Sequence, residues 1–164
     1  MGVAGSGKSS VASALGEALD LEVIEGDDHH PPTNVERMAA GIPLTDEDRR
    51  PWLQTLADHV GGRHAAGVGT VLACSALRRS YRDLLRSTVP GSESFVIELD
   101  ADAETLRARM ADRTGHFMPV SLLDSQLATL EPLQPDERGA IIDVTRPLDV
   151  VVDEALTAAS SLVG

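Results

Sequence analysis

A glycine-rich segment at residues 2–9, GVAGSGKS, constrains the fold of this chain more than any other feature. It matches the pattern G-x-x-x-x-G-K-[ST], in which a loop leaves the end of a buried strand and leads into a helix. A helical pattern does start near Lys8, because Val11 and Leu15 fall on one face. No strand pattern precedes the loop. We therefore expect the first strand of the sheet to be missing from the chain as given, with Met1 an internal methionine that follows about five residues rich in Val, Ile and Leu.

The residue types of this loop suit a nucleoside triphosphate. Glycines let successive backbone amides point inward and form a cradle for phosphates at a helix N-terminus. Lys8, the only lysine beside thirteen arginines, would reach the β and γ phosphates, and the Ser9 hydroxyl would coordinate Mg²⁺. We thus predict ATP and Mg²⁺ as cofactors, against the alternative of a chance Gly-rich turn. The predicted nucleotide-binding residues of the loop are Gly2, Val3, Ala4, Gly5, Ser6, Gly7, Lys8, Ser9 and Ser10.

Composition limits the partners of the chain. Of its 164 residues, 42% are hydrophobic and 2% are aromatic, and the net charge is −12. Such a surface repels polyanions and offers few rings for base stacking, so we expect no nucleic-acid partner. No apolar run approaches the roughly 20 residues that a membrane helix needs, so we expect no membrane partner. A single cysteine, Cys74, fits a reducing compartment, and we expect a cytoplasmic protein.

Helical patterns alternate with short apolar runs along the chain, which predicts a parallel α/β sheet within a single domain, residues 1–164. The expected strands cover residues 21–25, 70–74, 94–99 and 140–144. Three helix starts are predicted from capping pairs, namely Thr33 with Glu36, Thr45 with Asp48 and Ser121 with Asp124. The other expected helices begin near residue 8 or cover 79–86, 103 to about 112, and 148–162.

A second cluster of polar residues, GDDHHPPTN, follows the strand expected at residues 21–25. Ligands of open α/β sheets bind beside the carboxyl ends of the strands, so a carboxylate here could accept the proton of a hydroxyl that attacks the γ-phosphate. Asp27 and Asp28 are both candidates. A structural metal site is disfavoured because no second His or Cys cluster supplies further ligands. The alternative is a solvated loop without function.

Four stretches together resemble the gluconokinases of the small P-loop kinase type: GVAGSGKS, GDDHHPPTNVERMAAGIPLTDEDRRPWL, CSALRRSYRDLLR and GHFMPVSLLDSQLATLEPL. The resemblance implies transfer of phosphate from MgATP to the terminal hydroxyl of D-gluconate. It also implies a three-layer P-loop kinase fold with sheet order 2-3-1-4-5, a substrate-binding flap at about residues 30–60 and a lid at about 113–132. Members of the family are often homodimers. The family's acidic residue falls on Asp27, which makes Asp27 the preferred catalytic carboxylate.

Gluconate is a polyol with one carboxylate, so its site should offer a cation and several hydrogen-bonding groups. We predict Arg49, Arg78 and Arg82 as clamps for carboxylate or phosphate, although each could be an ordinary surface arginine. His30 and Gln126 could bind hydroxyl groups. Arg109 and Arg113, four apart on one helix face, resemble the lid arginines that bind the nucleotide, and Arg113 would be catalytic. The predicted adenine-binding loop, residues 143–148, is only weakly indicated.

Two other functions compete with this interpretation. A shikimate-kinase-like enzyme would share the core, but that family has a Gly triplet after its third strand, where this chain has CSAL, residues 74–77. A catalytically impaired nucleotide-binding module is the second alternative, suggested by the missing first strand. The presence of Lys8, Ser9 and Asp27 argues against it.

Overall fold

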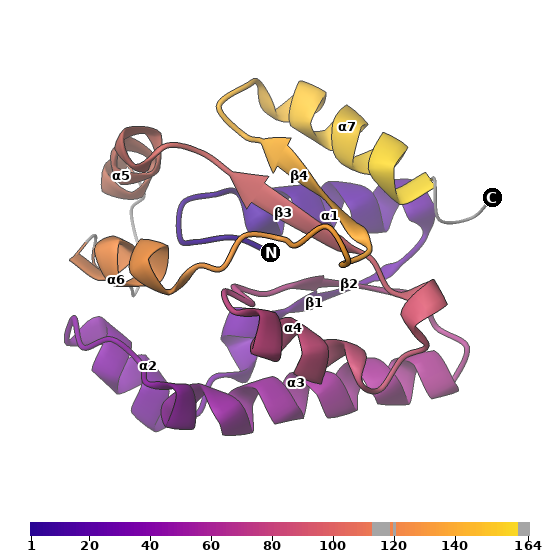
Figure 1. Cartoon of the computed structure of the whole chain (residues 1–164), viewed down its shortest axis with the longest axis horizontal. Coiled ribbons are helices and arrows are strands. Elements are labelled where there is room, and N and C mark those ends of the chain that lie inside the picture. The colour runs from indigo at the N-terminus through magenta and orange to yellow at the C-terminus, as the bar shows by residue number, and fades with distance from the viewer. Residues whose placement is uncertain (113–118, 120, 161–164) are drawn as a thin grey trace.

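Two pairs of parallel strands form the middle of the molecule (Figure 1). The computed structural model describes residues 1–112, 119 and 121–160. Strand β1 (Glu22–Glu25) pairs with β2 (Thr70–Ala73), with Ile24 opposite Leu72. Strand β3 (Val96–Asp100) pairs with β4 (Gly139–Asp143), with Glu98 opposite Ile141. All four strands expected from the sequence are therefore confirmed.

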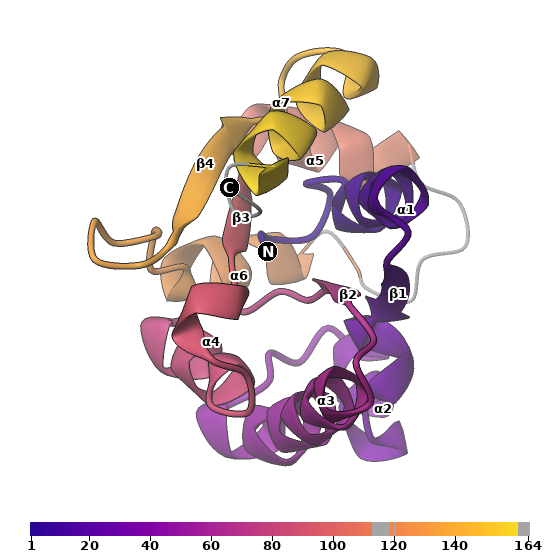
Figure 2. The same cartoon turned by 90° about the vertical axis from the view of Figure 1, so that its right-hand side faces the viewer.

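Helices cover both sides of the strands, which confirms the three-layer α/β prediction (Figure 2). One apolar core joins α1 and α7 to β3 and β4, and another joins α3 and α4 to β1 and β2. No helix among these described residues is long and apolar enough to cross a membrane. The α-helices are α1 (Lys8–Leu19), α2 (Pro32–Ala39), α3 (Asp46–Ala65), α4 (Arg79–Arg86), α5 (Ala103–Asp112), α6 (Ser121–Thr129) and α7 (Leu148–Ser160), and the 3₁₀ segments are η1 (Gly26–His29) and η2 (Gly91–Glu93).

The predicted helix starts are confirmed in one case and wrong in another. Thr45 and Asp48 form a reciprocal capping box at the start of α3. The box predicted at Thr33 does not form, because α2 already begins at Pro32 without a side-chain cap. Proline is suited to the first helical position, since its fixed φ matches the helix and the missing N–H has no partner there.

Residues 1 and 2 occupy the position between β2 and β3. The Met1 amino group donates to the Ile97 carbonyl, the Met1 carbonyl accepts from the Leu99 N–H at 2.9 Å, and the Gly2 N–H donates to the Ser75 carbonyl at 3.4 Å. The two bonds to β3 follow the pattern of a parallel pair, and the third reaches the end of β2, so Met1 lies where strand 1 of the expected 2-3-1-4-5 order would end.

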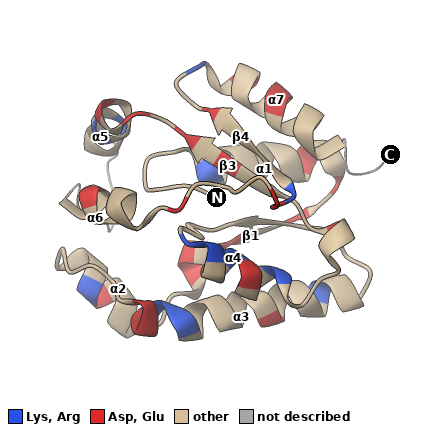
Figure 3. Cartoon of the chain, in the orientation of Figure 1, with Lys and Arg blue, Asp and Glu red and all other residues tan. Residues whose placement is uncertain are grey.

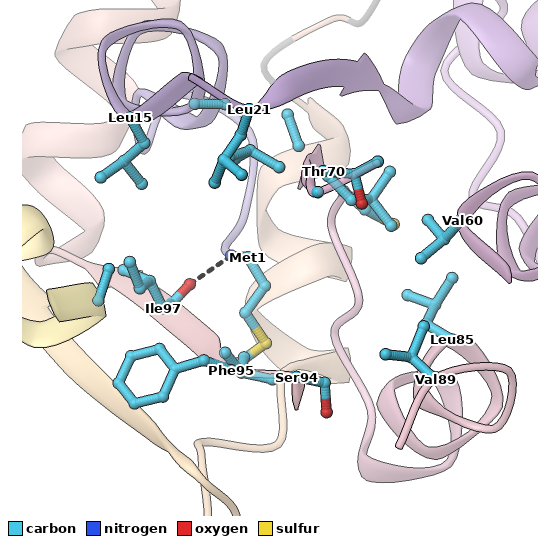
Figure 4. A pocket seen from close by; sticks show the side chains of 18 of the residues that line it. Met1, Leu15, Leu21, Val60, Thr70, Leu85, Val89, Ser94, Phe95 and Ile97 are labelled. Atoms are coloured by element: carbon cyan, nitrogen blue, oxygen red, sulfur yellow. Dashed lines mark hydrogen bonds between the residues drawn. The ribbon is translucent and has the colours of Figure 1, made fainter. Parts of the chain in front are cut away.

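A cavity of about 550 Å³ lies next to Met1, between the two strand pairs. Its lining is mainly apolar and includes Leu15, Val60, Leu85 and Phe95 (Figure 4). Within the described chain, this central position holds only residues 1 and 2.

A buried ion pair ties α4 to the segment that precedes β4. The Arg82 guanidinium is 1% exposed and donates to both carboxylate oxygens of Glu137, at 2.7 and 2.6 Å. Its remaining N–H groups face the carbonyls of Ala76, Glu131 and Pro132. All of its donors are thus used within the protein, and this arginine fixes the chain between α6 and β4.

We predict that Glu137→Gln strongly destabilises the fold. The substitution leaves the Arg82 charge buried without its counterion, which typically costs about 3 to 5 kcal/mol of unfolding free energy. Urea titration measures this loss. The matched control is Asp136→Asn, because Asp136 pairs with Arg79 at 67% side-chain exposure, and its loss should cost under about 1 kcal/mol. Equal stability of the two variants would contradict the prediction.

The same ion pair predicts an acid dependence of stability. Hydrogen bonds from Arg82 lower the pKa of Glu137 to about 2, from an ordinary value of 4.5. Because the pKa is depressed in the folded state, the stabilisation is fully present above pH 4.5 and is lost as pH falls through 2. The unfolding free energy of the native chain should fall across this range more steeply than that of Glu137→Gln. If the unfolding free energies of the two proteins fell in parallel with pH, the predicted acid dependence would be contradicted.

Candidate active site

The glycine-rich segment forms a loop, residues 2–7, that joins the centre of the sheet to α1 (Figure 1). Gly5 and Gly7 have φ values of 81° and 87°, in the left-handed region that glycine adopts without strain. A Cβ atom on Gly5 would also lie 3.1 Å from the Leu106 carbonyl oxygen of α5. Gly7 is the N-cap of α1, so the first amides of that helix open toward the loop.

A small pocket of about 30 Å³ lies beside this loop. It brings the predicted loop residues, among them Lys8 and Ser9, together with the predicted residues Asp27 and Gln126 from two other parts of the chain. Asp28 is exposed and is not part of the pocket lining. The complete lining is Ala4, Gly5, Gly7, Lys8, Ser9, Glu25, Asp27, Ala73, Ser75 and Gln126.

Glu25, the last residue of β1, is a site residue that no sequence pattern predicted. The Ser9 hydroxyl donates to the Glu25 carboxylate at 3.0 Å, so two oxygen groups lie together at the start of α1. Hard cations such as Mg²⁺ prefer this kind of donor. The sequence feature that could have indicated Glu25 is its position at the carboxyl end of a strand, two residues before Asp27. Ligands of open α/β sheets bind at this end of the strands.

Trp52 of α3 fixes the turn that carries Asp27. Its indole N–H donates to the Gly26 carbonyl at 2.7 Å, and its ring is 1% exposed. The His30 ring stacks on the indole, with ring centres 4.0 Å apart and planes 16° from parallel. The backbone of His30 closes the turn by donating to the Asp27 carbonyl at 3.3 Å. The turn at the end of β1 is therefore held by a buried aromatic side chain.

His30 lies in surroundings that favour the neutral imidazole. Burial lowers its pKa to about 4, and the Arg49 charge adds to this effect, while Asp27 opposes it. The Nδ1 atom is buried without a hydrogen-bond partner among the described residues. A neutral ring whose nitrogen has no partner can accept a hydrogen bond from a hydroxyl group or donate one to it.

The structure separates the three arginines predicted as clamps. Arg49 is 7% exposed, and its Nε donates to the Leu44 carbonyl at 3.4 Å. Burial lowers its pKa, and it takes part in no ion pair within the described chain. Arg78 is half-exposed and lies 3.3 Å from Asp46, which also accepts a hydrogen bond from the Tyr81 hydroxyl. Arg82 is the buried partner of Glu137 described above, and its donors are already engaged.

The predicted lid arginines lie at and beyond the end of α5. The Arg109 guanidinium donates to the Val144 carbonyl, in the loop that follows β4. That loop contains a turn in which Asp143 accepts from the N–H of Thr145 at 2.8 Å. Arg109 thus touches the predicted adenine-binding loop. Arg113, and residues 113–118 and 120 of the predicted lid, lie outside the described residues.

Comparison with known proteins places this geometry in context. The family described as "AAA domain" matches residues 1–133. The gluconokinase of Gluconobacter oxydans is 46% identical over 95% of this chain and 86% of its own length. A sugar kinase from Janibacter sp. HTCC2649 superposes with a TM-score of 0.93 at 49% identity, covering 98% of this chain and 91% of that one. A gluconokinase from Sinorhizobium meliloti superposes with a TM-score of 0.89 at 48% identity, covering 99% of this chain and 90% of that one.

We predict that His30 stays neutral down to about pH 4. An NMR titration of its ring protons, assigned by comparison with His30→Gln, should give a midpoint far below the ordinary 6.5. Because the folded pKa is depressed, protonation favours the unfolded chain, and the stabilisation from this residue should be lost as pH falls from 6.5 toward 4. A midpoint near 6.5 would show that the ring is solvated and not stacked on Trp52.

Proposed function

Because the chain belongs to the gluconokinase family, we propose that it transfers the γ-phosphoryl group of ATP to the terminal hydroxyl of D-gluconate, giving 6-phospho-D-gluconate. The single observation that carries this proposal is the pocket that unites Lys8 and Ser9 of the nucleotide loop with Asp27 at the end of β1. The identity to relatives named gluconokinase supports the choice of substrate.

On the nucleotide side, we propose that the amides of residues 5–10 bind the phosphates and that Lys8 neutralises their charge. The Ser9 hydroxyl and the Glu25 carboxylate are oxygen donors suited to Mg²⁺, and would hold it together with water and phosphate oxygens. The ion supplies charge neutralisation when it is bound. Arg109 on α5, which leads into the predicted lid at residues 113–132, and Arg113 at the start of that lid would bind the nucleotide.

On the acceptor side, we propose that Asp27 orients the attacking hydroxyl and accepts its proton. This transition state needs orientation more than strong basicity, so a well-positioned carboxylate is adequate. His30 would bind a neighbouring hydroxyl through its unpaired Nδ1. Trp52 would keep both groups in place through the fixed turn.

Arg49 is the best candidate for the gluconate carboxylate. A buried guanidinium that forms no ion pair among the described residues is costly, and a bound carboxylate would supply a direct counterion. Arg78 lies at the rim with Asp46 and could assist. Basic and acidic residues are interspersed along α2, α3 and α4 (Figure 3), and these helices present no purely basic surface. An anionic substrate therefore has to be held by a local cation against the net charge of −12. The flap at residues 30–60, a homodimer and a cytoplasmic location stay predictions.

The acceptor is tested by measuring ADP release with gluconate or shikimate as acceptor. We expect turnover with gluconate and at most background with shikimate. Asp27→Asn should lower kcat about 10²- to 10⁴-fold, since the proton acceptor is lost. Its exposed neighbour Asp28→Asn is the matched control and should retain activity. Preferred turnover of shikimate, no ADP release with any sugar acid, or full activity of Asp27→Asn would contradict the proposal.

Arg49 is tested by the split between KM and kcat. Arg49→Met should raise the KM for gluconate about 10- to 100-fold, as expected for the loss of a charge-assisted hydrogen bond, and leave the KM for ATP little changed. Arg50→Met, at the exposed adjacent position, is the control. An unchanged KM for gluconate in Arg49→Met would assign the carboxylate to another residue.

A further inference from the structure

One peptide group of the nucleotide loop, between Val3 and Ala4, is held at both ends. Its carbonyl accepts from the Lys8 ammonium at 3.0 Å and from the Ser6 N–H at 3.3 Å. Its N–H donates to the side-chain oxygen of Gln126 at 2.7 Å. Gln126 belongs to α6 and is 122 positions away in the sequence. The loop is therefore braced by a helix that lies within the predicted lid, residues 113–132.

The surroundings of this bond make it hard to replace by water. Gln126 is 5% exposed, Val3 3% and Ala4 8%. The loop residues pack into an apolar cluster with Leu106 of α5 and Leu123 of α6. A buried N–H that loses its acceptor cannot bond to water instead, so the peptide would rotate or the loop would shift.

We infer that Gln126 is a positioning residue of the nucleotide loop. By accepting the Ala4 N–H, it orients the Val3 carbonyl toward Lys8, and so fixes both the loop and the resting place of the only lysine. This inference rests on the proposed binding of ATP by the loop. It differs from the role expected from the sequence, in which the Gln126 side chain binds a hydroxyl of the sugar acid.

The two roles predict opposite effects on the two substrates. A braced loop presents its amides to the phosphates without first being ordered, so removal of the brace weakens ATP binding. The acceptor site does not depend on the Val3–Ala4 peptide, and its affinity should stay the same. Direct contact with gluconate would instead raise the KM for gluconate and leave ATP binding unchanged.

The test compares Gln126→Met, which keeps the length of the side chain without the acceptor, with Gln126→Asn, which withdraws the oxygen by one carbon. Calorimetric titration with MgATP alone should give a Kd about 5- to 30-fold higher for both variants, with the KM for gluconate unchanged. Gln54→Met is the matched control, because Gln54 is exposed on α3 and its side chain donates to the Asp58 carboxylate, away from the loop. Its Kd should equal that of the native chain.

A second measurement, on the native chain, does not depend on how the variants fold. The Ala4 amide should exchange slowly with solvent in hydrogen-exchange NMR, and faster in Gln126→Met. Rapid exchange in the native chain, an unchanged Kd for ATP in a folded variant, or a raised KM for gluconate alone would overturn the inference. Because the titration needs no gluconate, it keeps its meaning even if gluconate proves not to be the acceptor.

Discussion

The backbone of residues 2–7 is the constraint on which the rest of the site depends. The loop must leave the centre of the sheet, pass close to α5 and turn into α1, and the left-handed conformations of Gly5 and Gly7 allow this path. Its peptide groups are held by bonds to Lys8 and Gln126, within an apolar cluster that includes α6. Lys8 and Ser9 lie where they do because this loop is rigidly packed.

The second half of the site follows from the parallel arrangement of the strands. The carboxyl ends of β1 and β2 lie at the same edge as the loop, so Glu25 and the turn with Asp27 face Ser9 and Lys8. Trp52 then fixes this turn from α3. The proposed chemistry needs little more from the protein than such positioning, because phosphoryl transfer is accelerated mainly by alignment and charge neutralisation.

Local patterns predicted the parts of the structure that local physics decides. The glycine spacing gave the loop, apolar runs gave the four strands, and the Thr45–Asp48 pair gave the start of α3. The start of α2 was missed because Pro32 begins that helix one residue before the expected cap. Roles that depend on distant partners could not be found in this way. Arg82 looked like a substrate clamp, and only its contact with Glu137, 55 positions away, reveals a buried brace.

The most direct test of the whole account is an NMR titration of the isotope-labelled chain with a non-hydrolysable MgATP analogue. If the loop binds the triphosphate, the backbone amides of residues 5–10 should show the largest shift changes, and the Lys8 side chain should move from the Val3 carbonyl to the phosphates. Shift changes that are confined to other parts of the chain, with these amides unaffected at saturation, would contradict the account.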